Sequence, residues 1–289
     1  MTMNFQGNRF LFHLFSLCLF FSLCLVPAAQ ARGMQDSACH IEISKANNNA
    51  PEHFRVRNKT PGYLTMTFLL PMARNVISKP ELPQTWVFKP HSEQDLFTVF
   101  PKNPKMAWRY EYRYFWRNGR PDAAHNNSVR YRFPFQAGET FRVIQGFDGT
   151  FSHSGEFRFS IDWDMPSGTM VCAARSGLVV RVEDSFSGRG LTDNFRNRTN
   201  VILIEHEDGT IGEYSHFRKA GALVKPGQTV RTGQNLGYSG DVGYSDGPHL
   251  HFGVWRPLNG EKTESLPIMF TDGTHPFDEL TEGHSYTAR

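Results

Sequence analysis

Hydrophobic and polar residues alternate along residues 108–116, where an aromatic side chain occupies every second position. Arg109, Glu111 and Arg113 fall between these aromatics. Successive side chains of a β-strand point to opposite faces, so the pattern predicts a half-buried strand that ends at the turn Asn118-Gly119. The aromatic face could be a platform that binds glycans or the core of a sheet. Aromatic residues at a spacing of two are usually buried, which favours the core.

Similar alternation predicts further strands in the first half of the chain, at residues 63–70, 85–88 and 129–133. Turn residues separate these short strands, and no helical periodicity is long enough to predict a helix. We therefore expect residues 32–134 to form a small β-sandwich.

After about residue 135, glycine becomes frequent and the predicted strands are rich in valine and isoleucine. These strands cover residues 178–182, 201–205, 212–216 and 250–255. We expect a second domain here, an antiparallel β-sheet over residues 135–274, followed by a C-terminal tail over residues 275–289. The predicted fold class is all-β throughout.

Residues 184–200 lie between two of these strands and contain three arginines among serine, glycine and asparagine. This composition predicts an exposed loop. The loop could line a substrate groove or simply be solvated. The second interpretation is favoured because only some long loops carry function.

The first 31 residues have the pattern of a signal peptide. Arg9 is their only charged residue, an apolar run extends from Phe10 to Val26, and Ala29-Gln30-Ala31 provides a small-x-small cleavage site. We expect cleavage after Ala31 and export to the periplasm or the medium, without membrane insertion afterwards. An uncleaved membrane anchor is the alternative, because the apolar run approaches spanning length.

Composition and charge fit a globular protein of two ordinary domains. Of the 289 residues, 39% are hydrophobic and 20% are charged. Removing Arg9 with the signal peptide leaves 30 basic and 28 acidic residues, a formal net charge of +2. This near-neutral balance gives no electrostatic reason to expect a nucleic-acid partner.

Two cysteines, Cys39 and Cys172, lie outside the expected signal peptide. A disulfide between them is chemically permitted in an exported protein and would join the two domains. Two separate buried thiols are equally consistent with the sequence.

The sequence Gly247-Pro248-His249-Leu250-His251-Phe252 carries the strongest chemical signal. On a strand, His249 and His251 project to one side, while Leu250 and Phe252 project to the other. Two imidazoles that face one groove suggest a metal or catalytic site, although a histidine is also an ordinary, partly buried residue.

Three further residues, His153, Asp162 and His216, offer polar groups of the same kind. A catalytic zinc ion usually takes three protein ligands from histidine and carboxylate groups and keeps a fourth position for water. His153, Asp162 and one histidine of the 249/251 pair would complete such a set. The other histidine and His216 would then be free to transfer protons or stabilise charge.

In these motifs the chain resembles the lysostaphin-type, LytM-like zinc endopeptidases, a family that cuts peptidoglycan. The resemblance covers residues from about 145 to 255. The shared motifs are a His followed by an Asp (His153 and Asp162), Gly168-Thr169-x-Val171-x-Ala173, Gly177-x-Val179, Tyr214-x-His216 and the whole of Gly247 to Phe252.

The resemblance implies a role for each of these polar residues. His153, Asp162 and His251 would be the ligands of one zinc ion per chain, and His216 and His249 would be the catalytic histidines. The nine-residue interval from His153 to Asp162 is longer than in the best-known members. We expect a longer strand connection there that keeps both ligands.

By this resemblance we expect an exported zinc metalloendopeptidase that hydrolyses peptide bonds in the stems or cross-bridges of bacterial peptidoglycan, with no cofactor besides zinc. One alternative is a non-catalytic or latent regulator of other cell-wall hydrolases, which is disfavoured because all five positions are filled. Another is a secreted zinc peptidase that acts on proteins. The first domain could cover the groove or position the enzyme on the wall.

Two neighbouring residues receive structural interpretations. His206 precedes a predicted hairpin turn, and the ligand set is complete without it. Tyr214 shares a face of the predicted strand with His216, so it could flank the groove or be buried.

Overall fold

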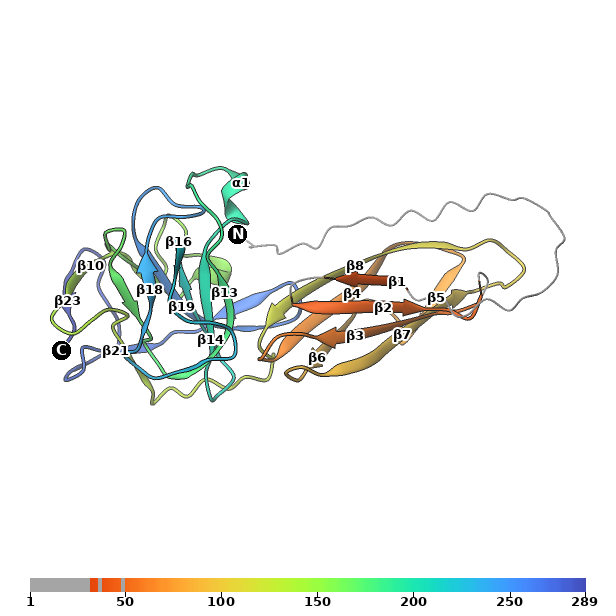
Figure 1. Cartoon of the computed structure of the whole chain (residues 1–289), viewed down its shortest axis with the longest axis horizontal. Helices are drawn as coiled ribbons and strands as arrows, with labels where there is room; N and C mark the ends of the chain where they lie inside the picture. The colour runs from red at the N-terminus through yellow and green to blue at the C-terminus, as the bar shows by residue number, and fades with distance from the viewer. Residues whose placement is uncertain (1–31, 36–37, 48–49) are drawn as a thin grey trace.

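A computed structural model describes residues 32–35, 38–47 and 50–289, so the predicted signal peptide lies outside the described residues. Two β-rich bodies lie end to end (Figure 1), here called the N-terminal body (residues 32–118) and the C-terminal body (residues 130–289). In the described residues the helical segments are α1 (Asp193–Arg196) and the 3-10 turn η1 (Gly155–Phe157). The all-β prediction is confirmed. No helix in this part of the chain is long and apolar enough to cross a membrane.

The N-terminal body consists of two antiparallel sheets. One has the strand order β1 (Arg32–Gln35), β2 (Cys39–Ser44), β3 (Glu52–Asn58), β7 (Glu93–Pro101) and β5 (Val76–Lys79). The other has the order β6 (Gln84–Phe88), β4 (Leu64–Arg74) and β8 (Arg109–Asn118). Both sheets contribute to one hydrophobic core, which makes this body the expected sandwich.

Aromatic side chains dominate the core of the sandwich. Phe54 stacks on Phe97 with ring centroids 4.3 Å apart. In β8, Tyr114 and Trp116 are buried, and the aromatics at positions 108, 110 and 112 pack partly buried against the same core. The alternating aromatics of residues 108–116 are therefore core residues rather than an exposed platform.

The C-terminal body is built around one nine-stranded antiparallel sheet. Its order is β17 (Thr229–Val230), β13 (Gly177–Glu183), β14 (Val201–Glu205), β15 (Ile211–Ser215), β19 (Leu250–Pro257), β11 (Ser160–Trp163), β10 (Thr140–Gln145) and β23 (Ser285–Thr287), with β20 (Thr263–Ser265) paired to β19.

Two three-stranded sheets complete this body. They are β12 (Met170–Cys172), β18 (Asn235–Ser239) and β16 (Phe217–Ala222), and then β22 (Pro276–Phe277), β21 (Met269–Thr271) and β9 (Arg130–Arg132). The pair formed by β9 and β21 is parallel.

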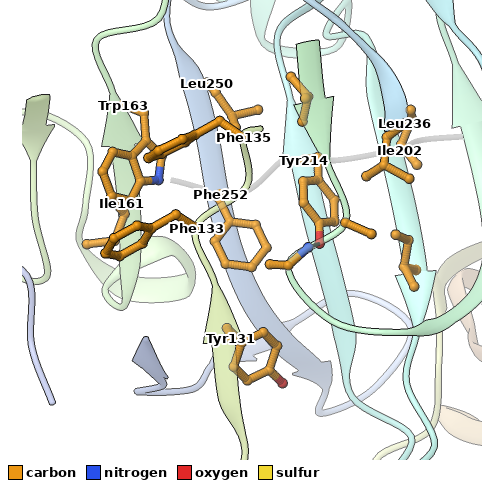
Figure 2. Close-up of a cluster of buried hydrophobic side chains, with 14 of the residues drawn as sticks. Tyr131, Phe133, Phe135, Ile161, Trp163, Ile202, Tyr214, Leu236, Leu250 and Phe252 are labelled. Atoms are coloured by element: carbon orange, nitrogen blue, oxygen red, sulfur yellow. Dashed lines mark hydrogen bonds between the residues drawn. The ribbon is translucent and has the colours of Figure 1, made fainter. Parts of the chain in front are cut away.

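The buried core of the C-terminal body lies against one face of its large sheet. Leu250 and Phe252 project into it from β19, and Ile161 and Trp163 project into it from β11 (Figure 2). Because side chains alternate along each strand, the residues between these anchors must face the other side. The core therefore determines which side chains are available to a site.

Both ends of the second body differ from the expected limits. Residues 129–133, expected in the first domain, lie in the second: β9 pairs with β21, and Tyr131 and Phe133 are buried in the second core. Residues 275–289, expected as a tail, also belong to it. Strand β23 pairs with β10, and Leu280 is 2% exposed.

The two bodies pack closely against each other at two glycines, where a larger residue would not fit. A Cβ added to Gly62 would lie 2.3 Å from Val180 Cγ1, and one added to Gly260 would lie 2.4 Å from the backbone of Phe115. Beside these contacts, the Tyr63 amide donates to Glu205 Oε2 at 3.0 Å. The bodies are thus held together by close packing as well as by hydrogen bonds.

The two cysteines are separate buried thiols, Cys39 in the core of the sandwich and Cys172 on β12. Burial raises the pKa of the Cys172 thiol to about 11. The structure therefore shows two separate buried thiols, and Cys39 and Cys172 form no disulfide with each other.

Candidate active site

One row of polar residues crosses the large sheet on the face away from the core. Gln145 on β10 is paired with Asp162 on β11, Asp162 with His251 on β19, and His251 with Ser215 on β15. Side chains at paired positions of neighbouring strands lie on the same face, about 5 Å apart. Strand register therefore brings together residues that lie up to 106 positions apart in the sequence.

Asp162 lies at the centre of this row and is almost fully buried, with 6% exposed. His251 Nδ1 lies 2.8 Å from Asp162 Oδ1 and is hydrogen-bonded to it. On the other side, Gln145 Nε2 donates to Asp162 Oδ2 at 3.2 Å. Burial opposes ionisation, but the hydrogen bond from His251 holds the pKa of Asp162 well below its usual range.

His153 reaches the same carboxylate from the loop that follows β10. Its Nδ1 donates to the carbonyl of Gly146 at 2.7 Å, so its Nε2 carries the lone pair. This Nε2 lies 3.2 Å from Asp162 Oδ1, is buried, and has no hydrogen-bond partner among the described residues. A lone pair and a carboxylate oxygen that face each other at this distance are stabilised by a cation between them.

The three predicted ligands fit a metal ion. One donor atom each from His153, Asp162 and His251 lies within 4.8 Å of the other two. Two imidazole nitrogens and one carboxylate oxygen are a donor set typical of catalytic zinc sites, which leave a fourth position open. Burial opposes protonation of His251, but its hydrogen bond with Asp162 raises the pKa of the imidazole.

His216 and His249 lie beside this cluster, with ring centroids 4.4 Å apart. His216 Nδ1 donates to the carbonyl of Val242 at 3.0 Å, and His249 Nδ1 donates to that of Gly247 at 2.8 Å. Each Nε2 is therefore left as a proton acceptor. Burial, together with the nearby His249 and His251, lowers the pKa of His216 to about 3, so this imidazole is neutral at pH 7.

The strand that was expected to carry His216 ends one residue earlier, at Ser215. His216 has a φ of 72°, in the left-handed region, and this conformation turns its side chain toward the site. Tyr214 faces the opposite way. It is fully buried in the core, and its hydroxyl accepts a hydrogen bond from the Ala174 amide at 2.8 Å. The expectation that Tyr214 and His216 share a face is wrong, and Tyr214 is a core residue.

A cavity of about 330 Å³ opens over these groups. Asp162, His216, His249 and His251 line it, whereas no residue of the N-terminal body does so within the ranges that the structure describes. Apolar side chains form part of the wall at Ile144, Phe151 and Phe157, and Phe151 is 62% exposed. The described sandwich therefore leaves this cavity uncovered.

The additional residues between His153 and Asp162 form the turn η1 rather than a longer strand connection. Glu156 on this turn accepts a hydrogen bond from the Thr263 amide at 2.9 Å, which ties the turn to β20. Phe157 lies beside His251, with ring centroids 5.7 Å apart. The insertion thus keeps both predicted ligands and adds an aromatic wall to the cavity.

Several residues of the cavity were not predicted from the sequence, among them Gln145, Glu213 and Arg196. Gln145 and Glu213 lie on strands of the large sheet, and Arg196 lies on α1 in the loop 184–200. Glu213 accepts hydrogen bonds from Ser215 Oγ at 2.9 Å and from Trp255 Nε1 at 2.8 Å. Only the arginine had a sequence signal, the cluster of arginines in a long loop, and that loop was expected to be solvated.

His206 does not lie in the cavity. Its Nδ1 donates to the carbonyl of Ser176 at 2.9 Å, and its ring packs on Tyr131 with centroids 5.6 Å apart. Burial lowers the pKa of this imidazole to about 4. The structural role expected for His206 agrees with this position.

Residues 156–265 match the family model of Peptidase family M23. This part of the chain is therefore similar to M23 peptidase domains. The match contains Asp162, His216, His249 and His251, and His153 lies three residues before its start. It covers less than half of the chain, and it supports a metallopeptidase that uses zinc.

Individual relatives of the M23 domain match over similar lengths. A protein named "Uncharacterized metalloprotease" from Buchnera aphidicola subsp. Baizongia pistaciae (strain Bp) is 36% identical over 95 residues. That match covers 33% of this chain and 22% of the relative, so the chain spans less than a quarter of that relative's length.

Solved structures of two catalytic domains also resemble part of this chain. The catalytic domain of lysostaphin from Staphylococcus simulans is 29% identical with a TM-score of 0.30, over 40% of this chain and 78% of that domain. The catalytic domain of the prophage-encoded M23 protein EnpA from Enterococcus faecalis is 27% identical with a TM-score of 0.35, over 46% of this chain and 93% of that domain.

Proposed function

We propose that this protein is an exported zinc metalloendopeptidase that hydrolyses peptide bonds in the stems or cross-bridges of bacterial peptidoglycan. The observation that carries the proposal is the convergence of His153, Asp162 and His251 beside two further imidazoles in an open cavity. The M23 match of residues 156–265 supports the same chemistry. Export is inferred from the pattern of residues 1–31.

In this proposal His153, Asp162 and His251 hold the zinc ion. A zinc ion bound there would polarise the scissile carbonyl and lower the pKa of water from ~15.7 toward ~7. Gln145 keeps the Asp162 carboxylate in place through its 3.2 Å hydrogen bond, and Gly146 keeps the His153 ring in place through its 2.7 Å hydrogen bond.

His216 and His249 share the proton transfers. Both rings are tethered at Nδ1 by backbone carbonyls, so both present Nε2 as a base in the neutral form. One of them accepts the proton of the attacking water. The other, when it is protonated at Nε2 as an imidazolium, stabilises the developing oxyanion or delivers that proton to the leaving amine.

The test is mass spectrometry of fragments released from purified cell-wall sacculi by residues 32–289 loaded with zinc. We expect release of fragments cleaved within their peptides, loss of this release in a chelator, and its recovery when zinc is restored. The fragments would identify the bond that is cut.

His249→Ala is the matched control for this experiment. It should keep one zinc ion per chain and lose turnover by a factor of about 10²–10⁴, because the histidine is assigned to proton transfer rather than to the metal. A zinc-loaded protein that releases nothing from sacculi would contradict the proposal. Cleavage of a protein substrate by that same preparation would then favour a secreted peptidase that acts on proteins.

A further inference from the structure

We propose that Arg196 is a specificity-determining residue that binds a free carboxylate group of the peptide substrate. This inference rests on the proposed function, because it concerns the substrate of the same cavity. It is carried by the position of the guanidinium group, by its unused hydrogen-bond donors and by the charges around it.

Contacts with a second loop hold Arg196 at the cavity. Its Cζ lies 3.9 Å from the centroid of the Tyr244 ring, and both residues line the cavity together with His216 and His249. The amide of Gly190, in the same loop as Arg196, donates to the carbonyl of Gly243 at 3.1 Å. The guanidinium is therefore placed by stacking and by pairing between the two loops, not only by its own chain.

The guanidinium keeps most of its donors available. Nε donates to Asp193 Oδ1 at 2.8 Å, whereas Nη1 and Nη2 donate to no protein group in the described parts of the chain. Asp193 is 90% exposed, so water weakens its electrostatic effect. The Arg196 side chain is only 20% exposed, which strengthens its attraction for an anion. Its planar pair of free nitrogens matches the two oxygens of a carboxylate.

The other charged groups of the cavity do not neutralise Arg196. Asp162 is held by the imidazoles and by Gln145, and Glu213 accepts from Ser215 and Trp255. Asp246 is exposed at the rim and forms no ion pair with Arg196 within the described residues. Apart from the histidines, Arg196 is the one basic residue among the described residues that line the cavity. Among the described side chains that line the cavity, Arg196 therefore provides the fixed positive charge for an incoming carboxylate.

Two kinds of peptide could supply this carboxylate, one with a free C-terminus and one with an acidic side chain. The experiment separates them with three acetylated, alanine-rich pentapeptides of otherwise identical sequence. The first contains glutamine and an amidated C-terminus, the second replaces glutamine by glutamate, and the third keeps glutamine but has a free C-terminus. Binding to the zinc-loaded His249→Ala protein is measured by calorimetry, so that no turnover is required.

At least one charged peptide should bind about tenfold more tightly than the neutral one, the effect of a charge-assisted pair in a partly buried site. Arg196→Gln should reduce this preference below about twofold and leave binding of the neutral peptide unchanged. Arg196→Lys, which keeps the charge but loses the planar fork, should keep about a threefold preference. Zinc content and unfolding temperature report whether each variant is folded.

Arg189→Gln is the matched control. Arg189 lies in the same loop, pairs with Asp241 at 3.3 Å and does not line the cavity, so the preference should survive its loss. Equal binding of all three peptides, or a preference that persists in Arg196→Gln, would overturn the inference. Because binding is the readout, failure of wall cleavage and failure of carboxylate recognition are separate results.

Discussion

Both bodies of this protein bury charged groups in or beside their β-strands, but the two groups differ in whether all their polar atoms have partners within the protein. In the N-terminal body, Lys45 Nζ lies 3.1 Å from Glu52 Oε1, and the Tyr110 hydroxyl donates to the other carboxylate oxygen. In the C-terminal body, Asp162 is surrounded by imidazoles whose Nε2 atoms, in His153 and His251, have no hydrogen-bond partner in the described chain. The first arrangement is complete as it stands, whereas the second has donor atoms available for a metal ion.

Buried charge alone does not mark a functional site. Lys45 and Glu52 side chains are 8% and 6% exposed, and Asp162 is buried to the same degree. The difference is whether each polar atom already has a partner. Changes to the two groups should therefore affect different properties of the protein.

The largest effect is expected from Asp162→Ala, which removes the ligand at the centre of the cluster. Zinc affinity should fall by more than about a hundredfold, since even groups that only support a ligand contribute ~10–100-fold. Release of wall fragments should be lost with the metal. Zinc per chain after dialysis, measured by atomic absorption, and the sacculus assay test this together.

Two variants serve as controls for the loss of metal. His249→Ala lies in the same cavity and Cys172→Ser lies outside it, and both should retain one zinc ion per chain because neither residue is assigned as a ligand. Retention of zinc by Asp162→Ala at the level of His249→Ala would show that the assignment of ligands is wrong.

A change to the buried Lys45–Glu52 pair tests how much this pair stabilises the N-terminal body. Lys45→Met leaves the buried Glu52 carboxylate without its cation, which should lower the free energy of unfolding of the N-terminal body by about 3–5 kcal/mol. Zinc content should be unchanged. Urea unfolding followed by tryptophan fluorescence, with zinc measured on the same preparation, gives both quantities.

An exposed ion pair of the same sandwich provides the control for Lys45→Met. Arg55 donates from Nε to Asp95 Oδ1 at 2.6 Å, but the two side chains are 48% and 73% exposed. Arg55→Met should change stability little, because water already solvates both groups. Equal unfolding curves for the two variants would remove the distinction between a buried and an exposed pair in this body.

The smallest of these effects is expected from Gln145→Ala, which leaves all three predicted ligands in place. Gln145 holds Asp162 Oδ2 and also donates to Ser152 Oγ at 2.7 Å. Zinc affinity should fall by about 10–100-fold, measured by competition with a chelator. Gln136→Ala, a change at an exposed glutamine of the same body, should have no effect. An unchanged affinity in Gln145→Ala would show that the carboxylate needs no support from this side chain.

Alternation predicted the parts of the site that lie on a regular strand. His249 and His251 both line the cavity, with Leu250 and Phe252 on the core side, as their spacing indicates. The rule worked because two large hydrophobic side chains on the same strand determine which face is buried.

The same rule failed at His216 because the strand ends before it. The left-handed φ of 72° is unusual for a residue other than glycine, and nothing in the surrounding residues predicts it. It is held by contacts from distant segments: the His216 amide donates to the carbonyl of Asn200, and the ring donates to that of Val242. A conformation fixed by tertiary contacts cannot be inferred from local alternation.

Gln145 and Arg196 show a further reason why part of the site could not be predicted. Gln145 acts through its register with Asp162, and Arg196 acts through its stacking on Tyr244, 48 positions later in the chain. Each residue type is ordinary in its local sequence. Their positions become informative only once strand pairing and loop contacts are known.

The row that crosses the sheet from Gln145 to Ser215 also has a consequence for folding. Asp162 and His251 are direct strand partners although 89 positions separate them, and closing so long a loop is slow. The three predicted metal ligands therefore come together only when β19 pairs with β11 between β15 and β10. Zinc binding should depend on the assembled sheet rather than on any short segment of the chain.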